Sequence, residues 1–439
     1  MRRSVVWRLA RLALALLICY LALGYLTPRV AWLSLSRAAG GKAPVRGALF
    51  GAPSDLRRVA GALAVHTERS HDAIGTDAEA IAAAKDAGLD FVILSDHRSR
   101  QTPDSLWSVN ARFDAGVLLV RGQEVSLGGD VGRVLTFGLD TALTRWDGGL
   151  QAFASRLERD SATAIVAHSR SPRLRDSWRA TRTPAIAGWE VFDLADIGRE
   201  RLEGPWVVYH LLALAASAPL DRLHWSLIRL FREGFDQPAV AAFDSLYERG
   251  DITALAGLDA HPKTRVFGHL VPAYEPLFKS LINYIALEEA GPGEAQAAEA
   301  TARLARALEH GRAYISFGDA EAARRFRLRL GGAGHGWVGL GAPAEWRPGL
   351  MLEAGFDGGG ERRLIYRVLR DGEALAWLEG PDLSWRLSGV GAYRVEVYRY
   401  TLRIGPFVWN LRPWIFANPN RVVNAVVGGE NTRPNPTDQ

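Results

Sequence analysis

Five short apolar runs between residues 58 and 320 are each followed directly by histidine or carboxylate side chains, and this feature constrains the fold most. Helical patterns such as TDAEAIAAAKDAG separate several of the runs. Short apolar strands that alternate with helices predict an α/β fold with a largely parallel sheet, either open or closed into a barrel. In such folds the functional site lies at the carboxyl ends of the strands, where these polar side chains stand.

The polar side chains that follow the five runs are candidate metal ligands. They are His66, His71, Asp72, Asp96, His97, Glu124, His168, Asp259 and His261. One such histidine is more often an ordinary core residue than a ligand, but five strands share the arrangement. Buried ionisable groups are costly unless they are paired or bind a metal, and one divalent cation offsets that cost for several groups together. The pattern therefore favours a metal site.

The ligands of such a site can only be nitrogen and oxygen atoms. The single cysteine, Cys19, lies in the apolar N-terminal segment, and no nucleophilic serine elbow is present. Histidine and carboxylate ligands suit Zn²⁺, Mn²⁺ or Fe²⁺. The net charge of +5 is modest, and no basic stripe is interleaved with aromatic residues, so we expect no nucleic-acid partner. The oligomeric state is not predictable from these features.

The N-terminus predicts a membrane anchor. Residues Val5 to Leu26 are almost all apolar, and at about 1.5 Å per residue this segment could cross roughly 30 Å of hydrocarbon. A cleavable signal peptide is the alternative. Because the apolar core of a signal peptide is normally shorter and no small-x-small site closely follows Tyr25, we expect an uncleaved, single-pass signal anchor, residues 1–35, in the inner (plasma) membrane. The tight basic cluster at the start favours the body on the periplasmic or extracytoplasmic side. Residues 36–56 are rich in Gly, Ala and Pro and are predicted to be a linker.

The pattern changes after about residue 320. Runs such as LIYRVLRDGEALAWLEG and LSWRLSGVGAYRVEVYRY alternate with period two, and Asp371-Gly372 is a hairpin signal. We therefore expect the metal site in residues 57–320, a small β-sandwich-like (Ig-like) domain over residues 321–428, and a disordered tail over residues 429–439.

The order of the motifs resembles the polymerase-and-histidinol-phosphatase (PHP) family. HTERSHDA, DAGLDFVILSDH, RGQEVS, AHS, GWEVFD and GLDAH follow one another with the spacing of that family. The anchor and the β-rich segment ending PWIFANPN resemble a membrane-anchored, exported branch of it. The resemblance implies a distorted (β/α)7 barrel with metal-dependent phosphoesterase activity. It also implies the metal ligands His66, Asp72, His97, Glu124, His168, Asp259 and His261.

Two positions depart from the family pattern. Ala64 replaces the first histidine of a His-x-His motif, and Arg133 stands where such sequences often have a metal-binding histidine. In the three-metal arrangement of the family, one centre would keep His66, Glu124 and Asp259. A second would keep only Glu124 and His168, and the third would be complete with Asp72, His97 and His261. We expect two metals, with one or three as the alternatives.

The leading hypothesis is hydrolysis of a phosphate monoester or diester by a metal-bound hydroxide. Glu124 would bridge the metals, and Asp259 or His168 would assist proton transfer. The guanidinium of Arg133 either replaces a lost cation and clamps the phosphate, or marks a degraded site. Arg98, Arg170 and Lys263 could bind the anionic substrate, a small molecule or a lipid headgroup. The alternatives are a hydrolase of carboxylic esters, amides or carbamates, and a non-catalytic binding protein.

Overall fold

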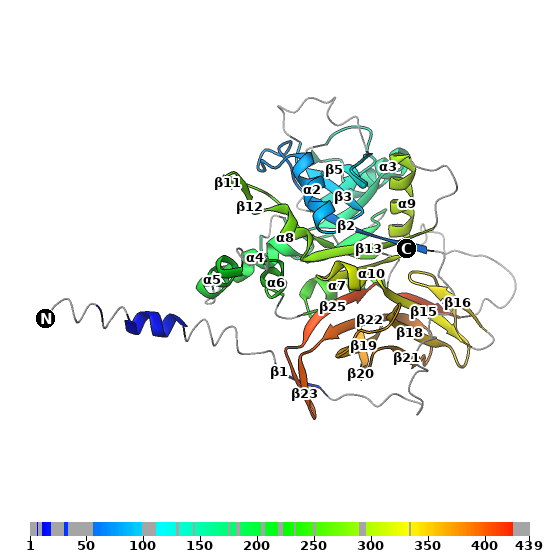
Figure 1. Ribbon diagram of the computed structural model, residues 1–439. Coiled ribbons are helices and arrows are strands. Elements are labelled where there is room, and N and C mark those ends of the chain that lie inside the picture. Colours follow the sequence, from blue (N-terminus) through cyan, green and yellow to red (C-terminus); the bar gives the residue numbers. More distant parts are fainter. Residues whose placement is uncertain are drawn as a thin grey trace.

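The computed structural model shows a mixed α/β half followed by a β-rich half (Figure 1). It describes residues 7, 11–18, 30–33, 56–98, 111–128, 131–143, 145–173, 176–180, 185–202, 207–217, 223–231, 234–248, 252–288, 296–332 and 335–424. The predicted linker lies outside the described residues except for Leu56, and so does the predicted tail. The mixed α/β fold predicted for the first half is confirmed.

The predicted membrane anchor is described only in part. Residues 7 and 11–18 are helical, and the rest of Val5 to Leu26 lies outside the described residues. Among the helices that the structure describes, none is long and apolar enough to span a bilayer.

Seven strands of the first half pair side by side. They follow the order β2 (Leu56–Val65), β3 (Phe91–Asp96), β5 (Val117–Leu127), β6 (Gly132–Phe137), β8 (Thr163–Ala167), β9 (Gly188–Asp193) and β10 (Thr253–Gly257). Backbone hydrogen bonds from Leu258 to Leu63 and from Ala260 to Ala64 join the end of β10 to the end of β2. The pairings therefore return to β2, and these seven strands are called the ring below.

Strand β6 runs antiparallel to both of its neighbours, while the other neighbours in this ring run parallel. The helices that follow or precede these strands are α2 (Asp77–Asp86), α3 (Leu150–Asp160), α4 (Leu194–Leu202), α5 (Val207–Ser217), α6 (Leu223–Ile228) and α7 (Pro238–Tyr247). Because β5 and β6 form a hairpin and four helices follow β9, the helices do not alternate regularly with the strands. The distorted (β/α)7 barrel therefore stays a prediction.

Helix α2 begins where the sequence indicates. Thr76 accepts a hydrogen bond from the backbone N–H of Glu79, and the Glu79 carboxylate accepts one from the backbone N–H of Thr76. This capping box satisfies two N–H groups at the start of the helix.

The remaining elements of the first half are β4 (Ala111–Asp114), β7 (Arg145–Trp146), β11 (Thr264–Val266), β12 (His269–Val271), α8 (Tyr274–Phe278), β13 (Leu281–Glu288), α9 (Ala297–Glu309), β14 (Ala313–Phe317) and α10 (Ala320–Arg324).

The inside of the ring is filled by every second side chain of the strands. A buried apolar cluster contains Leu63, Phe91, Ile93, Leu118, Val120, Leu135, Phe137, Ile165, Ala167 and Leu255. Successive side chains of a strand point to opposite faces. Side chains two or four residues further along the same strand therefore point to the same face as the cluster residues. Glu124 lies four residues after Val120 within β5, whereas His97 and Asp259 lie one and two residues after the ends of β3 and β10. The packed interior therefore leads directly to the candidate ligands.

The β-rich half contains two groups of mainly antiparallel strands. One sheet is β16 (His335–Gly339), β15 (Phe326–Gly332), β18 (Met351–Phe356) and β21 (Leu383–Arg386). The other contains β20 (Glu373–Glu379), β19 (Leu364–Arg370), β22 (Gly391–Arg399) and β25 (Arg412–Ala417), with β26 (Asn420–Val423) and β17 (Ala344–Glu345). Asp371 (φ 52°) and Gly372 (φ 79°) join β19 to β20, which confirms the predicted hairpin.

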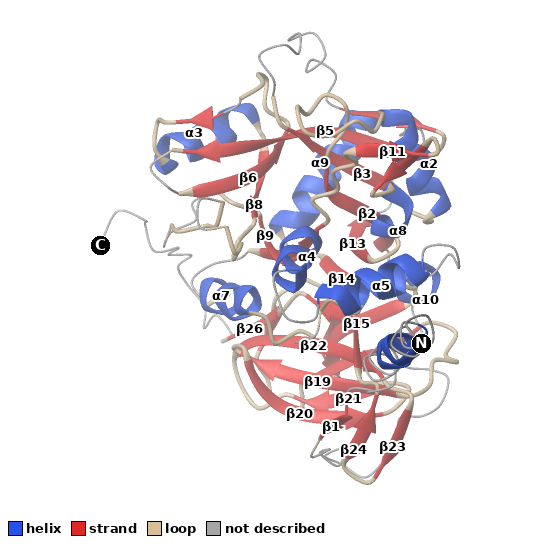
Figure 2. Ribbon diagram, turned by 90° about the vertical axis from the view of Figure 1, so that its left-hand side faces the viewer, coloured by secondary structure: helices blue, strands red, loops and turns tan. Residues whose placement is uncertain are grey.

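The two halves share a continuous sheet. Strand β13 pairs with β2 and with β14, and β14 pairs with β25 of the β-rich half. Figure 2 shows β14 between the ring and the β-rich strands. The predicted boundary at residue 320 and the sandwich-like domain both stay predictions.

Candidate metal centre

Two overlapping groups of ligand atoms form at the carboxyl ends of the ring strands. The first contains His66, Asp72, His97 and His261, and the second contains His66, Glu124 and Asp259. Within each group the ligand atoms lie within 4.8 Å of one another. The structure thus brings together six of the seven ligands that the family resemblance implies, and His66 belongs to both groups.

The distances between these atoms suit metal coordination. His66 Nε2 lies 3.5 Å from Glu124 Oε2 and 3.7 Å from Asp259 Oδ1. Asp72 Oδ2 lies 3.3 Å from His261 Nε2 and 3.9 Å from His97 Nε2. Ligand atoms that share one ion at about 2.0–2.2 Å lie about 3–4 Å apart, so both groups have this spacing.

Unused polar atoms give a second test of fit. Asp72 Oδ1 is buried and has no hydrogen-bond partner within the part of the chain that the structure describes, and His261 Nε2 has only the Asp72 carboxylate beside it, with Oδ2 at 3.3 Å. Such buried atoms are costly unless something binds them. His66 Nε2 has a weaker alternative, because the Ser95 hydroxyl lies 3.2 Å from it. The nitrogen and carboxylate oxygen atoms fit Zn²⁺, Mn²⁺ or Fe²⁺.

The electrostatics of the two groups also suit a cation. Burial, together with the charge of His261, lowers the pKa of His66 well below its usual range, so its ring is neutral and its nitrogen can act as a ligand. Burial lowers the pKa of His261, but the carboxylates of Asp259 and Asp72 outweigh it and raise this pKa to about 10. The two carboxylates thus favour positive charge at this place, which a divalent ion would supply.

Two arginines pair with the carboxylate oxygens that point away from His66. Arg133 Nη1 donates to Glu124 Oε1 at 2.7 Å, and Arg199 Nη2 donates to Asp259 Oδ2 at 2.7 Å. Arg133 reaches this place because β6 runs opposite to its neighbours, so the start of β6 lies at the carboxyl ends of β5 and β8. Each carboxylate therefore presents one oxygen to a ligand group and the other to a guanidinium.

His168 lies beside these groups in a separate network. Its Nε2 is 3.9 Å from Glu124 Oε1, and its Nδ1 is 2.9 Å from Asp193 Oδ2 and 3.0 Å from Asp196 Oδ2. Carboxylates at Nδ1 fix the orientation of an imidazole whose other nitrogen faces a metal site. His168 Nδ1, Glu190 and Asp193 also form a third group that could hold an ion, but the two aspartates already pair with this nitrogen.

Two of the site residues lie in left-handed backbone. His168 has φ 51° and is the first residue after β8, and Asp259 has φ 46° and is the second residue after β10. This conformation costs free energy for residues other than glycine, and residues that adopt it are found more often at functional sites. Ala64 also has φ 58°, and it is buried in the interior cluster of the ring. The position where the family pattern has a histidine is therefore part of the apolar core in this protein.

All members of the two ligand groups except the fully buried His66 line a cavity of about 500 Å³. The basic side chains on its wall are Arg98, Arg133, Arg173, Arg199 and Lys263, and the exposed His71 also lines it. Two of the three further substrate-binding residues predicted, Arg98 and Lys263, thus face the same space as the candidate ligands.

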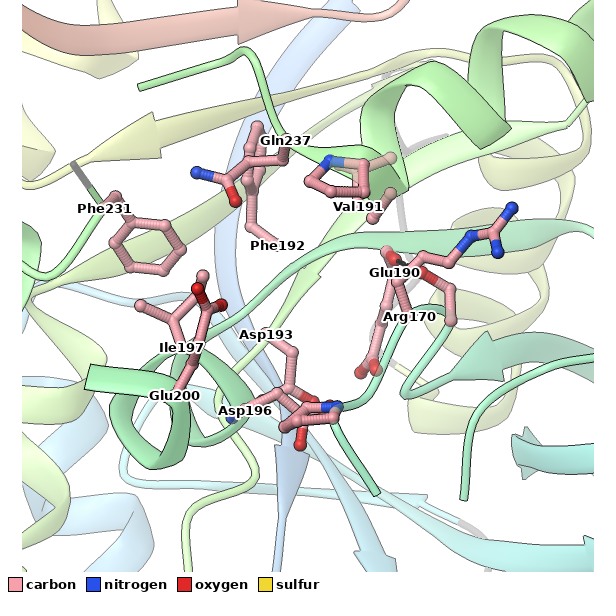
Figure 3. A pocket seen from close by; sticks show the side chains of 14 residues that line it. Arg170, Glu190, Val191, Phe192, Asp193, Asp196, Ile197, Glu200, Phe231 and Gln237 are labelled. Atoms are coloured by element: carbon pink, nitrogen blue, oxygen red, sulfur yellow. Dashed lines mark hydrogen bonds between the residues drawn. The ribbon is translucent and has the colours of Figure 1, made fainter. Parts of the chain in front are cut away.

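Arg170 does not line this cavity. It lines a smaller pocket of about 80 Å³, where Figure 3 shows Arg170 and Glu190 across from Phe231 and Ile197. Arg170 was predicted as a substrate-binding residue because it follows His168 closely, and this pocket is also lined by Glu190, Asp193 and Asp196, so a substrate-binding role of Arg170 stays a prediction. Asp96 is not a member of any ligand group. Its carboxylate accepts hydrogen bonds from the backbone N–H and the hydroxyl of Thr67, at 2.6 and 2.9 Å, and so holds the loop after β2.

Sequence reasoning missed the carboxylates and the arginine that surround the ligands. They are Asp176, Glu190, Asp193, Asp196 and Arg199. The motif GWEVFD, which contains Glu190 and Asp193, was the available signal. Gly257 also belongs to this arrangement, because a Cβ atom there would lie 2.0 Å from Glu190 Oε1.

No family model and no curated protein matches this sequence. Among solved structures, a two-domain protein from Bacteroides vulgatus that contains a predicted PHP-like metal-dependent phosphoesterase is similar over 83% of this chain and 96% of that chain, with 10% identity and a TM-score of 0.38. The lesion-specific endonuclease PfuEndoQ from Pyrococcus furiosus is similar over 54% of each chain, with 13% identity and a TM-score of 0.30. Similarities this low carry no argument about the activity of this chain.

Proposed function

We propose that this protein is a metal-dependent phosphoesterase that hydrolyses a phosphate monoester or diester. The observation that carries the proposal is the pair of overlapping ligand groups that share His66, with guanidinium groups on the outer oxygens of Glu124 and Asp259. A bound divalent metal would polarise a phosphoryl oxygen and lower the pKa of a coordinated water toward about 7. Two ions, one for each ligand group, fit this arrangement.

The residues of the chain have distinct roles in this proposal. Glu124 Oε2 and Asp259 Oδ1 would hold metal together with His66 Nε2, while Asp72, His97 and His261 hold the second ion. His168, fixed at Nδ1 by Asp193 and Asp196, keeps its Nε2 toward the cavity, where it would exchange a proton with the reacting group.

The charges on the cavity wall favour a phosphate over a carbonyl substrate. Four arginines and one lysine line the cavity, and guanidinium groups match phosphate oxygens in pairs. An ester, amide or carbamate without an anionic group would leave these cations without a substrate partner. A carbonyl hydrolase is therefore the second candidate, and a protein that only binds an anion is the third.

We further propose that residues 1–35 hold the chain in the inner membrane, with the body outside the cytoplasm. The apolar residues Val5 to Leu26 support this proposal. The substrate would then be an extracytoplasmic phosphate ester or a lipid headgroup.

Metal analysis combined with a hydrolysis assay tests the proposal. We expect about two metal ions per chain after incubation with Zn²⁺ or Mn²⁺ and dialysis, together with hydrolysis of a generic phosphomonoester or phosphodiester. A chain that binds metal but cleaves only a carboxylic ester would support the second candidate. Less than one ion per chain and no hydrolysis of any substrate would exclude catalysis.

Replacing Arg133 by methionine is expected to weaken substrate binding more than it slows the chemical step. The side chain is one-quarter exposed to the cavity and pairs with Glu124 and Asp176. Loss of a charge-assisted contact to phosphate costs about 1.5–3 kcal/mol, so we expect KM to rise on the order of 10- to 100-fold with a smaller change in kcat. Arg133→Lys keeps the charge without the paired donors and should recover only part of the loss. An unchanged KM in Arg133→Met would contradict the phosphate-clamp role.

A further inference from the structure

A small three-stranded sheet projects from the β-rich half. It consists of β1 (Val30–Trp32), β24 (Phe407–Trp409) and β23 (Leu402–Ile404), in that order and antiparallel throughout. Figures 1 and 2 both show β1 and β23 at the lower edge of the molecule, away from β3 and β5 of the ring.

One face of this sheet is apolar and exposed. Leu402 is in register with Trp409, and Ile404 is in register with Phe407, so these four side chains share a face. Leu402, Ile404 and Phe407 are 51%, 59% and 40% exposed. The Phe407 and Trp409 rings lie 6.2 Å apart, which makes the face a continuous aliphatic and aromatic surface.

The opposite face of the sheet is buried against the body of the protein at Val408 on β24 and exposed to solvent at Arg403 on β23. Val408 is fully buried in the main hydrophobic core, whereas Arg403, its register partner, pairs with Glu379 at 2.9 Å. The burial of Val408 fixes the sheet on the body and leaves the apolar face outward. Exposed apolar patches of this kind mark contacts with proteins or membranes.

The chain connection identifies the bilayer as the occupant of this face. The apolar run Val5 to Leu26 ends four residues before Val30, the first residue of β1. Four residues span at most about 14 Å of extended chain. If the run lies in a bilayer, as proposed above, β1 and its neighbours lie close to the bilayer surface. Tryptophan and phenylalanine beside aliphatic residues suit that interface.

We infer that the apolar face of the β1–β24–β23 sheet, carried by Leu402, Ile404, Phe407 and Trp409, contacts the lipid bilayer. This inference rests on the proposed membrane anchoring and does not depend on the reaction that the site catalyses. The contact would place the β-rich half, rather than the ring, next to the bilayer.

Spin labelling of the full chain tests this inference. Cys19 is the single cysteine, so Cys19→Ser gives a background in which one nitroxide label can be placed at Leu402→Cys, Arg403→Cys or Ile404→Cys. The labelled chains are incorporated into vesicles of phosphatidylcholine and phosphatidylglycerol. Flotation of the vesicles measures anchoring, and power saturation measures collisions with oxygen and with a water-soluble nickel complex. Thermal midpoints equal to that of the background show that each labelled chain is folded.

The inference predicts an alternating result. Labels at 402 and 404 should collide several-fold less with the nickel complex, and more with oxygen, than the matched label at 403 on the other face. Equal access of nickel to all three labels in chains that float would overturn the contact while leaving the anchoring intact. Chains that fail to float overturn both. Shielding of labels 402 and 404 in detergent without vesicles would assign the face to a second copy and overturn the bilayer contact.

Discussion

Glu124→Gln is expected to remove metal and lower the rate of hydrolysis on the order of 10³-fold or more. The Glu124 side chain is buried, and its Oε2 lies 3.5 Å from His66 Nε2 and 3.9 Å from His97 Nε2, between the two ligand groups. An amide supplies only one neutral oxygen in place of two charged ones. Metal ions stabilise the charge of the transition state by several kcal/mol, and each 1.36 kcal/mol is tenfold in rate.

Metal content by mass spectrometry and kcat/KM against a phosphate ester measure this effect. Glu353→Gln is the matched control, because Glu353 is also buried and also pairs with an arginine, Arg329, at 2.8 Å, but on β18 far from the ligands in sequence. It should leave both readouts unchanged. If Glu124→Gln kept its metal and its rate, the placement of the two metal sites would be wrong.

The largest effect on stability is expected from Arg394→Met. Arg394 is 3% exposed, and its guanidinium pairs with Asp244 on α7 and with Glu396 at 3.1 Å. It thus joins a helix of the first half to the sheet of the second. Removal of one member of a buried ion pair typically lowers the free energy of unfolding by about 3–5 kcal/mol. Because Glu396 keeps a second partner, Arg367, at 3.3 Å, we expect a loss near the lower end of this range, about 3 kcal/mol.

Denaturation by urea, followed by circular dichroism, measures this change. Arg347→Met is the control, since Arg347 pairs with Glu345 at 2.9 Å and both side chains are about half exposed. Exposed pairs of this kind contribute about 0–1 kcal/mol. Equal shifts of the midpoint in the two variants would show that the Arg394 network does not stabilise the junction between the halves.

The strands and the polar side chains at their ends could be predicted from the sequence. The run FVILSD is fully buried as β3, and the alternation in LIYRVLRDGEALAWLEG forms β19 and β20 with Asp371-Gly372 between them. Both signals are local, because a buried strand needs apolar neighbours and a tight turn needs residues that accept positive φ. For the same reason His97 and Glu124 could be named as site residues.

The partners of these side chains could not be predicted. Arg199 pairs with Asp259, which is 60 positions later in the sequence, and this contact depends on the pairing of β9, which α4 directly follows, with β10. Arg170 was expected in the site for its position beside His168, yet it lines a different pocket. Once the backbone has left a strand, the side chains of residues close in sequence need not point into the same cavity.

The sequence by itself indicated several of the segments that form strands and the side chains that follow them, because hydrophobic period and turn chemistry act over a few residues. Only the tertiary structure decided which oxygens of Glu124 and Asp259 face His66 and which take Arg133 and Arg199. It also joined β14 to β25 and so tied the two halves together. These choices depend on contacts between segments far apart in the chain, whose geometry is set by packing rather than by local pattern.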